Sequence, residues 1–477
     1  MPGIHAWGSY LPRLRLKRST VAAQLAWFNR SIKGLATGTR TVGNWDEDAV
    51  TMAVAAAQSA LNMVSEAKPG RLVFASTTAP FLDRSHSGLM AEVLDLPAAI
   101  QTQDVSGSQR AATSAVLAAL ASEQHTLVTA ADRRAALPGG GAEMRYGDAG
   151  AAVLIGPGPG CAECLATWSA ALDFVDHYRS QDLGRDYELE DRWVRDAGIL
   201  ATVPDAVQAA CAEAGLEVST IDHLVLPLPA RHGRKVASAL GLPAESLADT
   251  LHGEVGETGT GHSLVMLAAL LERCASNQVI ALVGFGQGCD VALFRTTAAL
   301  ESIKDSPFAD ALANGRELTD YLKLPYFSGQ LSLDEGIRAE ADKRTAMSTY
   351  FRRHRDLNGM IGSVCTACDT PHFPRARVCV ACQAVDQMDD YRFAHRRASV
   401  KSFTEDWLAA TPSPPFCYGN VAFEGGGNAF LEITDVEAGE LSIGSPLKMA
   451  FRVKDYDRAR GFRRYFWKPV PAGDNHG

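Results

Sequence analysis

The sequence predicts an α/β fold, in which a duplicated, layered domain is followed by a cysteine-bearing segment and a small β-rich module. Three observations lead to this prediction. Short apolar runs alternate with alanine-rich helical patterns over residues 1–300, two glycine-rich segments of similar sequence occur in that region, and short strands of alternating polarity follow residue 361. Alternating strands and helices are typical of layered α/β domains, whereas closely spaced strands with glycine and proline turns are typical of small β-barrels.

Six apolar runs in the first 300 residues are expected to form buried strands. Their continuous apolar character is that of strands covered on both faces. The segments between them carry apolar residues at helical spacing. The expected strands are residues 71–76, 126–131, 151–155, 223–228, 278–284 and 290–294, and the expected helices are residues 47–63, 110–122, 204–214 and 262–275.

The two halves of this region resemble each other. Each half contains an apolar strand that runs into threonine- or proline-rich turns, LVFASTTAP from residue 72 and LVLPLPA from residue 224. Each half also ends in a glycine-rich segment that enters a strand, YGDAGAAVLIG at 146–156 and GFGQGCDVALF at 284–294. A duplicated α/β unit is a more specific prediction than a generic doubly wound sheet, and we place its halves at residues 1–165 and 166–300.

The remainder of the chain divides into three parts. Residues 301–360 are charged and helical in pattern, and we expect a connector. Residues 361–390 hold four closely spaced cysteines. Residues 391–477 carry short strands separated by glycine and proline turns, a spacing that suggests a small barrel of OB type. The basic and aromatic tail at 451–469 is expected to supply a barrel strand and a surface.

The four cysteines are the most specific motif in the chain. Cys365, Cys368, Cys379 and Cys382 form two C-x2-C pairs separated by ten residues. Two such pairs can place four thiolates around one tetrahedral Zn2+, with no coordination position left for water or substrate. The expected zinc site is therefore structural and stabilises a ribbon too small to fold on its own core. An iron site is the alternative.

The bulk composition argues against two classes of function. The 477 residues include 46% hydrophobic and 21% charged residues, and the net charge is −9. Nucleic acid is not expected as the main partner, because a phosphate-binding face must be basic. No apolar run reaches the roughly 20 residues of a membrane span, and the first residues lack the apolar core of a signal peptide. We expect a cytoplasmic protein that binds no membrane.

Several segments resemble known families. GIHAWGSYLP near the N-terminus, DVSGSQRAATSAVLAAL at 104–120 and the two glycine-rich segments resemble the thiolase superfamily, in particular its 3-hydroxy-3-methylglutaryl-CoA synthase and ketoacyl synthase III branch. The four cysteines, HFPRARVC between them and FEGGGNAFLEITDV near residue 430 resemble zinc-ribbon plus OB-fold domains that accompany thiolase-type enzymes. The resemblance implies an α/β/α/β/α layered fold, an acyl-CoA substrate, and a homodimer or a thiolase-like partner subunit.

The residues on which synthase chemistry depends are replaced in this chain. The resemblance places Gln109 where the family carries its acyl-accepting cysteine, at the start of a buried helix. It places Leu226 at the family's histidine, Glu257 at its asparagine and Thr77 at its acidic general base. Without a thiolate there is no covalent acyl carrier, so an acyl-enzyme at position 109 is not expected. A glutamine amide can instead donate a hydrogen bond to a carbonyl or enolate oxygen.

A glycine-rich turn supplies the candidates for a general base. Glu257 lies in LHGEVGETGTGH together with His252 and His262, and partial burial beside histidines can tune a carboxylate towards neutral pKa. We therefore expect Glu257 or His252 to act as the base. The alternative is that Glu257 caps the helix that starts near His262 and that both histidines are surface loop residues.

Two further segments are candidates for substrate binding. Arg231, Arg234 and Lys235 match a basic segment of the synthase family that opens a helix, and they are expected to bind the phosphates of CoA. A solvated helix face is the alternative. His177 and Tyr178 resemble a substrate-side segment of the same family.

Three hypotheses about function follow. In the first, the chain makes or breaks a C–C bond of an acyl-CoA, by condensation, decarboxylation or aldol- or Claisen-type cleavage, with Gln109 and backbone N–H groups as the oxyanion site. In the second, it is a non-catalytic subunit that supports an active thiolase, and the zinc and OB part binds or channels acyl-CoA. In the third, it is a true synthase whose nucleophile is Cys289, for which a buried core position is the alternative.

Overall fold

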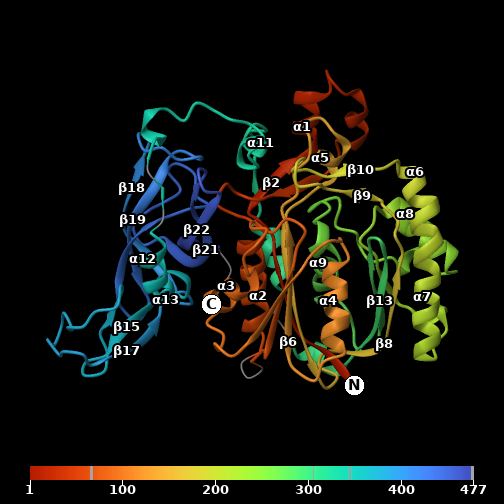
Figure 1. Cartoon of the computed structure of the whole chain (residues 1–477), viewed down its shortest axis with the longest axis horizontal. Helices are drawn as coiled ribbons and strands as arrows, with labels where there is room; N and C mark the ends of the chain where they lie inside the picture. The colour runs from red at the N-terminus through yellow and green to blue at the C-terminus, as the bar shows by residue number, and fades with distance from the viewer. Residues whose placement is uncertain (65–67, 304–305, 342, 345, 474–477) are drawn as a thin grey trace. The chain divides into compact units, whose positions relative to one another are not determined.

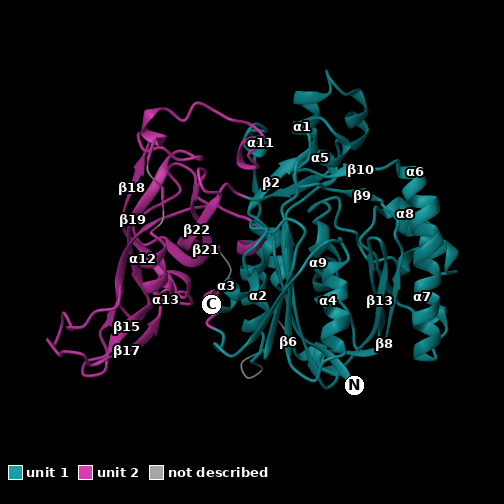
Figure 2. Cartoon of the chain, in the orientation of Figure 1, with its two compact units in different colours: residues 1–43, 52–91, 96–325 teal, residues 44–51, 92–95, 326–477 magenta. Residues whose placement is uncertain are grey.

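The computed structural model describes residues 1–64, 68–303, 306–341, 343–344 and 346–473, and the chain forms two compact units (Figure 2). Unit 1 comprises residues 1–43, 52–91 and 96–325, and unit 2 comprises residues 44–51, 92–95 and 326–477. Two short segments from the N-terminal half of the chain therefore belong to the unit that contains its C-terminal part.

A nine-stranded mixed sheet organises unit 1, in the order β11-β12-β13-β8-β1-β7-β6-β4-β5. Strand β4 is parallel to both β5 and β6, and β11 is parallel to β12, whereas the strands between them pair antiparallel. Most of these strands are buried along their length, which explains their continuous apolar sequences. The strands are β1 (Pro2–Tyr10), β4 (Arg71–Ala75), β5 (Gln101–Val105), β6 (Thr126–Asp132), β7 (Ala149–Pro157), β8 (Ala162–Ala171), β11 (His223–Val225), β12 (Val279–Phe285) and β13 (Gly288–Thr296).

Two small sheets complete the strands of unit 1. One contains β2 (Leu14–Lys17), β3 (Thr39–Val42) and β14 (Arg316–Glu317). The other is a short hairpin of β9 (His177–Tyr178) and β10 (Tyr187–Glu188), in which His177 lies opposite Glu188 and Tyr178 opposite Tyr187.

Helices cover the large sheet in layers (Figure 1). Helices α4 (Ala111–Leu120) and α9 (His262–Leu271) lie in the middle, between the part of the sheet that contains β6 and the part that contains β13. Helix α2 (Ala49–Asn62) lies on one outer side, and α7 (Leu200–Ala214) and α8 (Ala230–Ala239) lie on the other. The arrangement is the α/β/α/β/α layering that the sequence predicts.

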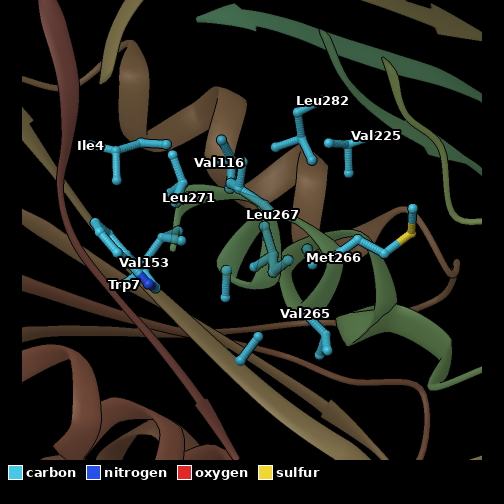
Figure 3. Packing of buried hydrophobic residues seen from close by; sticks show 14 of the residues in the cluster. Ile4, Trp7, Val116, Val153, Val225, Val265, Met266, Leu267, Leu271 and Leu282 are labelled. Atoms are coloured by element: carbon cyan, nitrogen blue, oxygen red, sulfur yellow. The ribbon is translucent and has the colours of Figure 1, made fainter. Parts of the chain in front are cut away.

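The central layer forms the main hydrophobic core. All ten residues of α9 are buried, as is typical of a helix that is apolar on every side. Figure 3 shows Leu267 and Leu271 of α9 packed among Val116 of α4, Val153 of β7 and Trp7 of β1. The remaining helices are α1 (Arg18–Leu25), α3 (His86–Val93), α5 (Gly141–Arg145), α6 (Asp191–Trp193), α10 (Pro307–Ala313), α11 (Lys323–Phe327), α12 (Met347–Arg352) and α13 (His354–Asn358).

Most expected elements of unit 1 are present, and the start of one helix differs from the prediction. Helix α7 begins at Leu200, before Pro204, and follows a π-helical turn at Val194–Ile199. The sequence prediction started this helix at the proline, because proline lacks the N–H that a helix interior needs, but Val203 is fully buried and keeps the preceding residues in the helix. The segment after residue 300, expected to be a helical connector, contains several short helices and the two-residue strand β14 (Arg316–Glu317).

Unit 2 contains two antiparallel sheets. The first has the order β16-β15-β17, and the second has the order β20-β19-β18-β21-β22. The backbone N–H of Thr434 donates to Pro469 O at 3.0 Å, so the chain just after β20 reaches β22 at the opposite edge of the five-stranded sheet. The strands are β15 (Ile361–Cys365), β16 (Pro371–His372), β17 (Met388–Arg392), β18 (Ala398–Asp406), β19 (Phe416–Phe423), β20 (Asn428–Glu432), β21 (Pro446–Asp457) and β22 (Phe462–Pro471).

A buried ionic network holds unit 2 together. Arg452 donates to Glu47 at 2.5 Å and to Asp435 at 2.7 Å, and Lys468 lies 3.0 Å from Asp46 and 2.7 Å from Glu432. Both cations are almost fully buried. The basic tail at 451–469 therefore lies in two strands, β21 and β22. Its buried cations Arg452 and Lys468 form ion pairs within unit 2, and two of their carboxylate partners lie in segment 44–51.

Among the helices of the described residues, none is both long enough and apolar enough to cross a membrane.

Candidate functional site

Gln109 lies at the start of central helix α4, next to the second glycine-rich segment. A Cβ atom added to Gly286 would lie 2.6 Å from Ser108 Oγ and 3.4 Å from the backbone nitrogen of Gln109. Ser108 Oγ also donates to Gly286 O at 2.7 Å. The close approach requires glycine at position 286, since any side chain would push the two segments apart. The two halves of the duplicated unit thus meet at Gln109.

The side chain of Gln109 contacts a histidine–aspartate pair. Its Nε2 atom lies 2.9 Å from Nε2 of His177, and Nδ1 of His177 lies 2.7 Å from Asp176 Oδ2. When Nδ1–H donates to the carboxylate, Nε2 is free of a proton and accepts from the glutamine amide. Burial lowers the pKa of His177, but the hydrogen bond and charge of Asp176 outweigh it and raise that pKa above its ordinary value. The raised pKa makes the imidazole of His177 a stronger base than a free histidine.

Glu257 is held in an ion pair. Its Oε1 atom and its backbone oxygen both accept from Arg134 Nη2, each at 3.0 Å. Burial raises the pKa of Glu257, but the charge of Arg134 outweighs it and lowers that pKa to about 2. The carboxylate is ionised at neutral pH and is a weak proton acceptor.

The two histidines near Glu257 lie in a buried environment. Their ring centroids are 5.0 Å apart. His262 lies 3.1 Å from Thr258 Oγ1 and 3.1 Å from Thr250 O, and burial lowers its pKa to about 3, so it is neutral. Burial also lowers the pKa of His252. Within the described part of the chain, neither ring nitrogen of His252 has a hydrogen-bond partner.

The two remaining positions carry no group that titrates near neutral pH. Thr77 donates its backbone N–H and its hydroxyl to Asp132, at 2.8 Å and 3.0 Å, and its backbone oxygen accepts from Arg179. Leu226 is fully buried and packs in the core between the sheet and its outer helices. A leucine there leaves the site without the imidazole that the sequence resemblance associates with this position.

Comparisons with known proteins agree with this architecture. The family model described as 3-oxoacyl-(acyl-carrier-protein) synthase III C terminal matches residues 211–294. A hydroxymethylglutaryl-CoA synthase of Aeropyrum pernix is 26% identical over 350 residues, which cover 71% of this chain and 93% of that protein. A crystal structure of a hydroxymethylglutaryl-CoA synthase complexed with CoA has a TM-score of 0.57 at 19% identity and covers 67% of this chain and 88% of that one.

A structure of 3-oxoacyl-(acyl carrier protein) synthase III from Pseudomonas aeruginosa gives the same result. Its TM-score is 0.55 at 22% identity, and the match covers 62% of this chain and 98% of that one. Unit 1 has the thiolase-superfamily fold. The fold that the sequence resemblance implies for the first 300 residues is thereby confirmed.

The thiolase-like unit carries the expected CoA-binding cations on its outer helix α8. Arg231, Arg234 and Lys235 are exposed there, and Arg231 Nη2 lies 2.6 Å from Asp191 Oδ1. Tyr178 is also exposed, and its ring lies 5.3 Å from that of Tyr187 in the β9–β10 hairpin. Of the five residues expected to bind substrate, His177 is the one that the structure brings to Gln109.

Cys289 is unsuited to nucleophilic catalysis in the thiolase-like unit. It is fully buried in β13, where it pairs with Phe285 and Ala170. Burial raises the pKa of its thiol to about 12, so the reactive thiolate is scarce at neutral pH. The buried-core alternative for Cys289 fits the structure.

Sequence reasoning missed Asp176, Arg134 and Asp186. Asp176 stands next to His177 in the segment DFVDHYR, and this adjacency was an available signal. Arg134 and Asp186 carry no such signal. Arg134 is far in sequence from both Glu257 and Asp186, and the fold of the thiolase-like unit brings it to both.

The four cysteines of unit 2 converge. All four Sγ atoms lie within 4.8 Å of one another, with 3.6 Å between Cys365 and Cys382 and 3.5 Å between Cys368 and Cys379. A disulfide would need about 2.05 Å, whereas a tetrahedron of thiolates at about 2.3 Å from zinc has edges of about 3.8 Å. The arrangement fits a metal ion held by four thiolates.

Proposed function

We propose that this chain acts on an acyl-CoA and makes or breaks a C–C bond without a cysteine nucleophile. The observation that carries the proposal is the series Gln109–His177–Asp176, which places an amide donor and an imidazole base at the start of the central helix of a thiolase-like unit. The synthase relatives support the substrate class, because one solved structure is complexed with CoA.

The proposed chemistry needs an oxyanion site and a base, but no covalent carrier. In an aldol-type cleavage, Nε2 of His177 accepts the hydroxyl proton of a 3-hydroxyacyl-CoA, the bond between the α and β carbons breaks, and its electron pair forms the thioester enolate. The amide of Gln109 donates to the enolate oxygen. Protonation of the α carbon by the imidazolium then releases the shortened acyl-CoA and a carbonyl product. Run in reverse, the same groups support condensation.

The contacts favour His177 over the bases expected from the sequence. Glu257 forms an ion pair with Arg134, which lowers its pKa to about 2 and makes it a weak base. The pKa of His252 is lowered by burial. The catalytic roles of Glu257 and His252 remain predictions, as do the CoA contacts of Arg231, Arg234, Lys235 and Tyr178.

A second candidate function is that of a non-catalytic subunit that supports an active thiolase. The specific observation in its favour is the Arg134–Glu257 ion pair at the position where the resemblance places a neutral asparagine, together with the buried Leu226 at the histidine position. Both replacements remove the neutral polar side chains that the sequence resemblance places at these two positions.

The edge of the large sheet in unit 1 offers a surface for a second copy of this chain or for a thiolase-like partner subunit. Strand β5 ends the sheet, and its residues Gln101, Thr102, Gln103 and Asp104 are exposed. An exposed edge strand presents unpaired backbone groups to another chain. We propose a homodimer or a thiolase-like partner subunit at this edge.

For unit 2 we propose a structural zinc site and an OB-type barrel. The zinc proposal rests on the convergence of Cys365, Cys368, Cys379 and Cys382. The barrel proposal rests on the strand order β20-β19-β18-β21-β22 and on the hydrogen bond between Thr434 and Pro469. We propose that the chain after residue 300 is divided as expected, into a connector at 301–360, a ribbon at 361–390 and a barrel at 391–477. A cytoplasmic location remains a prediction from the sequence.

The test is an activity assay on the purified chain. We expect cleavage, decarboxylation or condensation of CoA esters by the chain alone, and Gln109→Ala should lower kcat about 100-fold, the cost of an oxyanion donor. Gln208→Ala, at an exposed position on α7, is the control. Copurification with a thiolase-like partner, with no turnover by this chain alone, would instead establish the second candidate function.

A further inference from the structure

The β9–β10 hairpin carries His177 to Gln109 and is bound to the rest of unit 1 by charged side chains. The hydroxyl of Tyr146 donates to Glu188 Oε1 at 2.9 Å and lies 3.1 Å from Asp186 Oδ2. Arg145 pairs with Glu188. Arg179, on the hairpin, pairs with Asp186 at 2.6 Å and donates to Thr77 O. Ion pairs therefore set the position of a hairpin too short to be stable by itself.

Arg134 lies at the centre of these contacts. Its side chain is 2% exposed. One nitrogen, Nη2, donates to the carboxylate and backbone oxygen of Glu257, and the other, Nη1, lies 3.5 Å from Asp186. Its guanidinium carbon lies 3.7 Å from the centre of the Tyr146 ring. The guanidinium thus links the glycine-rich turn at Glu257 to the hairpin through Asp186.

Because the two strands of the hairpin are paired, the position of Asp186 helps to fix the position of His177. His177 is paired with Glu188, which is two residues beyond Asp186. We propose that Arg134 is a positioning residue of the site, which holds the β9–β10 hairpin so that His177 faces Gln109. This inference rests on the proposed function for its kinetic consequences, although its structural consequence can be measured without turnover.

The charges of the cluster balance when Arg134 is present. Three guanidinium groups, on Arg134, Arg145 and Arg179, face three carboxylates, on Asp186, Glu188 and Glu257. Loss of Arg134 leaves one carboxylate in excess in a buried place, which favours protonation of nearby groups.

The pKa of His177 is expected to respond to the loss of the Arg134 charge. The charged groups that act on His177 are Asp176 and Asp186, which raise its pKa, and Arg134, which lowers it. Replacement of Arg134 by a neutral residue is therefore expected to raise the pKa of His177. If His177 must be unprotonated to accept a proton, the acid limb of the rate profile moves to higher pH.

The experiment compares Arg134→Met, Arg134→Lys and a control, Arg195→Met, which removes a surface arginine paired with Asp196. Titration of the His177 ring by NMR and the pH dependence of kcat and KM are the readouts, with acyl-CoA esters as substrates. For Arg134→Met we expect a raised pKa of His177, a loss of about tenfold or more in kcat, and KM within about twofold. Arg134→Lys should restore the wild-type pKa but little of kcat, because an ammonium cannot bridge two carboxylates as a planar guanidinium does.

A second variant covers the case in which Arg134→Met does not fold. Arg134→Met combined with Glu257→Met removes both charges of the pair, which is tolerated better than removal of one, and it should also raise the pKa of His177. An unchanged pKa of His177 in either folded variant overturns the inference. If the wild-type chain turns over no acyl-CoA, the proposed function fails, while the NMR titration still decides the role of Arg134.

Discussion

Gln109 lies where the sequence resemblance places the family's acyl-accepting cysteine, and its neighbours suit an amide at this position. Gln109 offers no pair of electrons for attack on a thioester, but its amide is 2.9 Å from an imidazole whose other nitrogen meets a carboxylate. Glu257, the carboxylate at the position of the family's asparagine, is paired with Arg134. At the residue scale, His177 is therefore the proton acceptor that we propose, and its basicity depends on Asp176.

Asp176→Asn tests that dependence. Asp176 raises the pKa of His177, whereas burial and Arg134 lower it. With the carboxylate removed, the lowering effects remain, so the pKa of His177 should fall below its ordinary value. The acid limb of the profile of kcat against pH should move to lower pH, and kcat at its maximum should drop about tenfold or more, because a weaker base accepts the proton.

NMR titration of His177 and rate measurements from pH 5 to 9 are the measurements for this variant. Asp182→Asn, at an exposed position of the β9–β10 loop, removes one negative charge without touching the imidazole and is the matched control. A profile for Asp176→Asn that coincides with that of the control would contradict the assignment of His177 as base.

At the scale of elements, the proposed base and the four clustered cysteines lie on short segments that have no hydrophobic core of their own. The β9–β10 hairpin contributes two residues per strand and is positioned by ion pairs. The ribbon of β15, β16 and β17 is similarly small, and its four cysteines lie at one end. Small elements of this kind need side-chain or metal links, because they bury too little apolar surface to offset their chain entropy.

Zinc content tests the ribbon. We expect about one zinc ion per chain, held by the four thiolates, and Cys379→Ser should lose most of the metal and unfold the ribbon. Elemental analysis and proteolysis after residue 360 are the measurements. Cys417→Ser is the control, since Cys417 is buried in the five-stranded sheet outside the cluster. Protein with intact thiols and no metal would refute the zinc assignment.

At the scale of the whole molecule, the boundary between the two units does not follow the order of the chain. Residues 44–51 come from the N-terminal half but belong to unit 2, where Asp46 and Glu47 pair with Lys468 and Arg452. Buried cations of this kind require their partners, because an unpaired buried charge costs several kcal/mol. The C-terminal part of unit 2, residues 326–477, therefore depends on a segment that precedes it by more than 270 residues in the chain (residue 51 to residue 326).

Lys468→Met tests this dependence. It leaves Asp46 and Glu432 buried without their shared cation, and we expect a loss of about 3 kcal/mol in the stability of unit 2. Lys454→Met is the matched control, because Lys454 also pairs with Glu432, at 2.7 Å, but is 43% exposed. Its expected loss is below about 1 kcal/mol. Equal losses in urea unfolding of the two variants would show that the buried pairing adds no stability.

Sequence patterns alone were enough to predict the fold class of unit 1 and most of its long strands and helices. Apolar runs at 71–76, 126–131 and 278–284 could be assigned because a strand covered on both faces needs apolar side chains throughout. The cysteine spacing likewise predicted the cluster in unit 2, because each C-x2-C pair is a local turn whose geometry depends on neighbouring residues. The sequence resemblance also predicts that Gln109 stands in place of the family's cysteine.

Only the tertiary structure decided which charged groups act on Gln109. Arg134 contacts both Asp186 and Glu257, and His177 contacts Gln109, although these residues are distant in sequence. The same holds for Asp46 and Lys468 in unit 2. Periodicity and spacing report local structure, whereas the pKa of a side chain depends on burial and on nearby charges in space. Of the two bases expected from the sequence, Glu257 is paired with Arg134 and His252 has a pKa lowered by burial, and the contacts favour His177 instead.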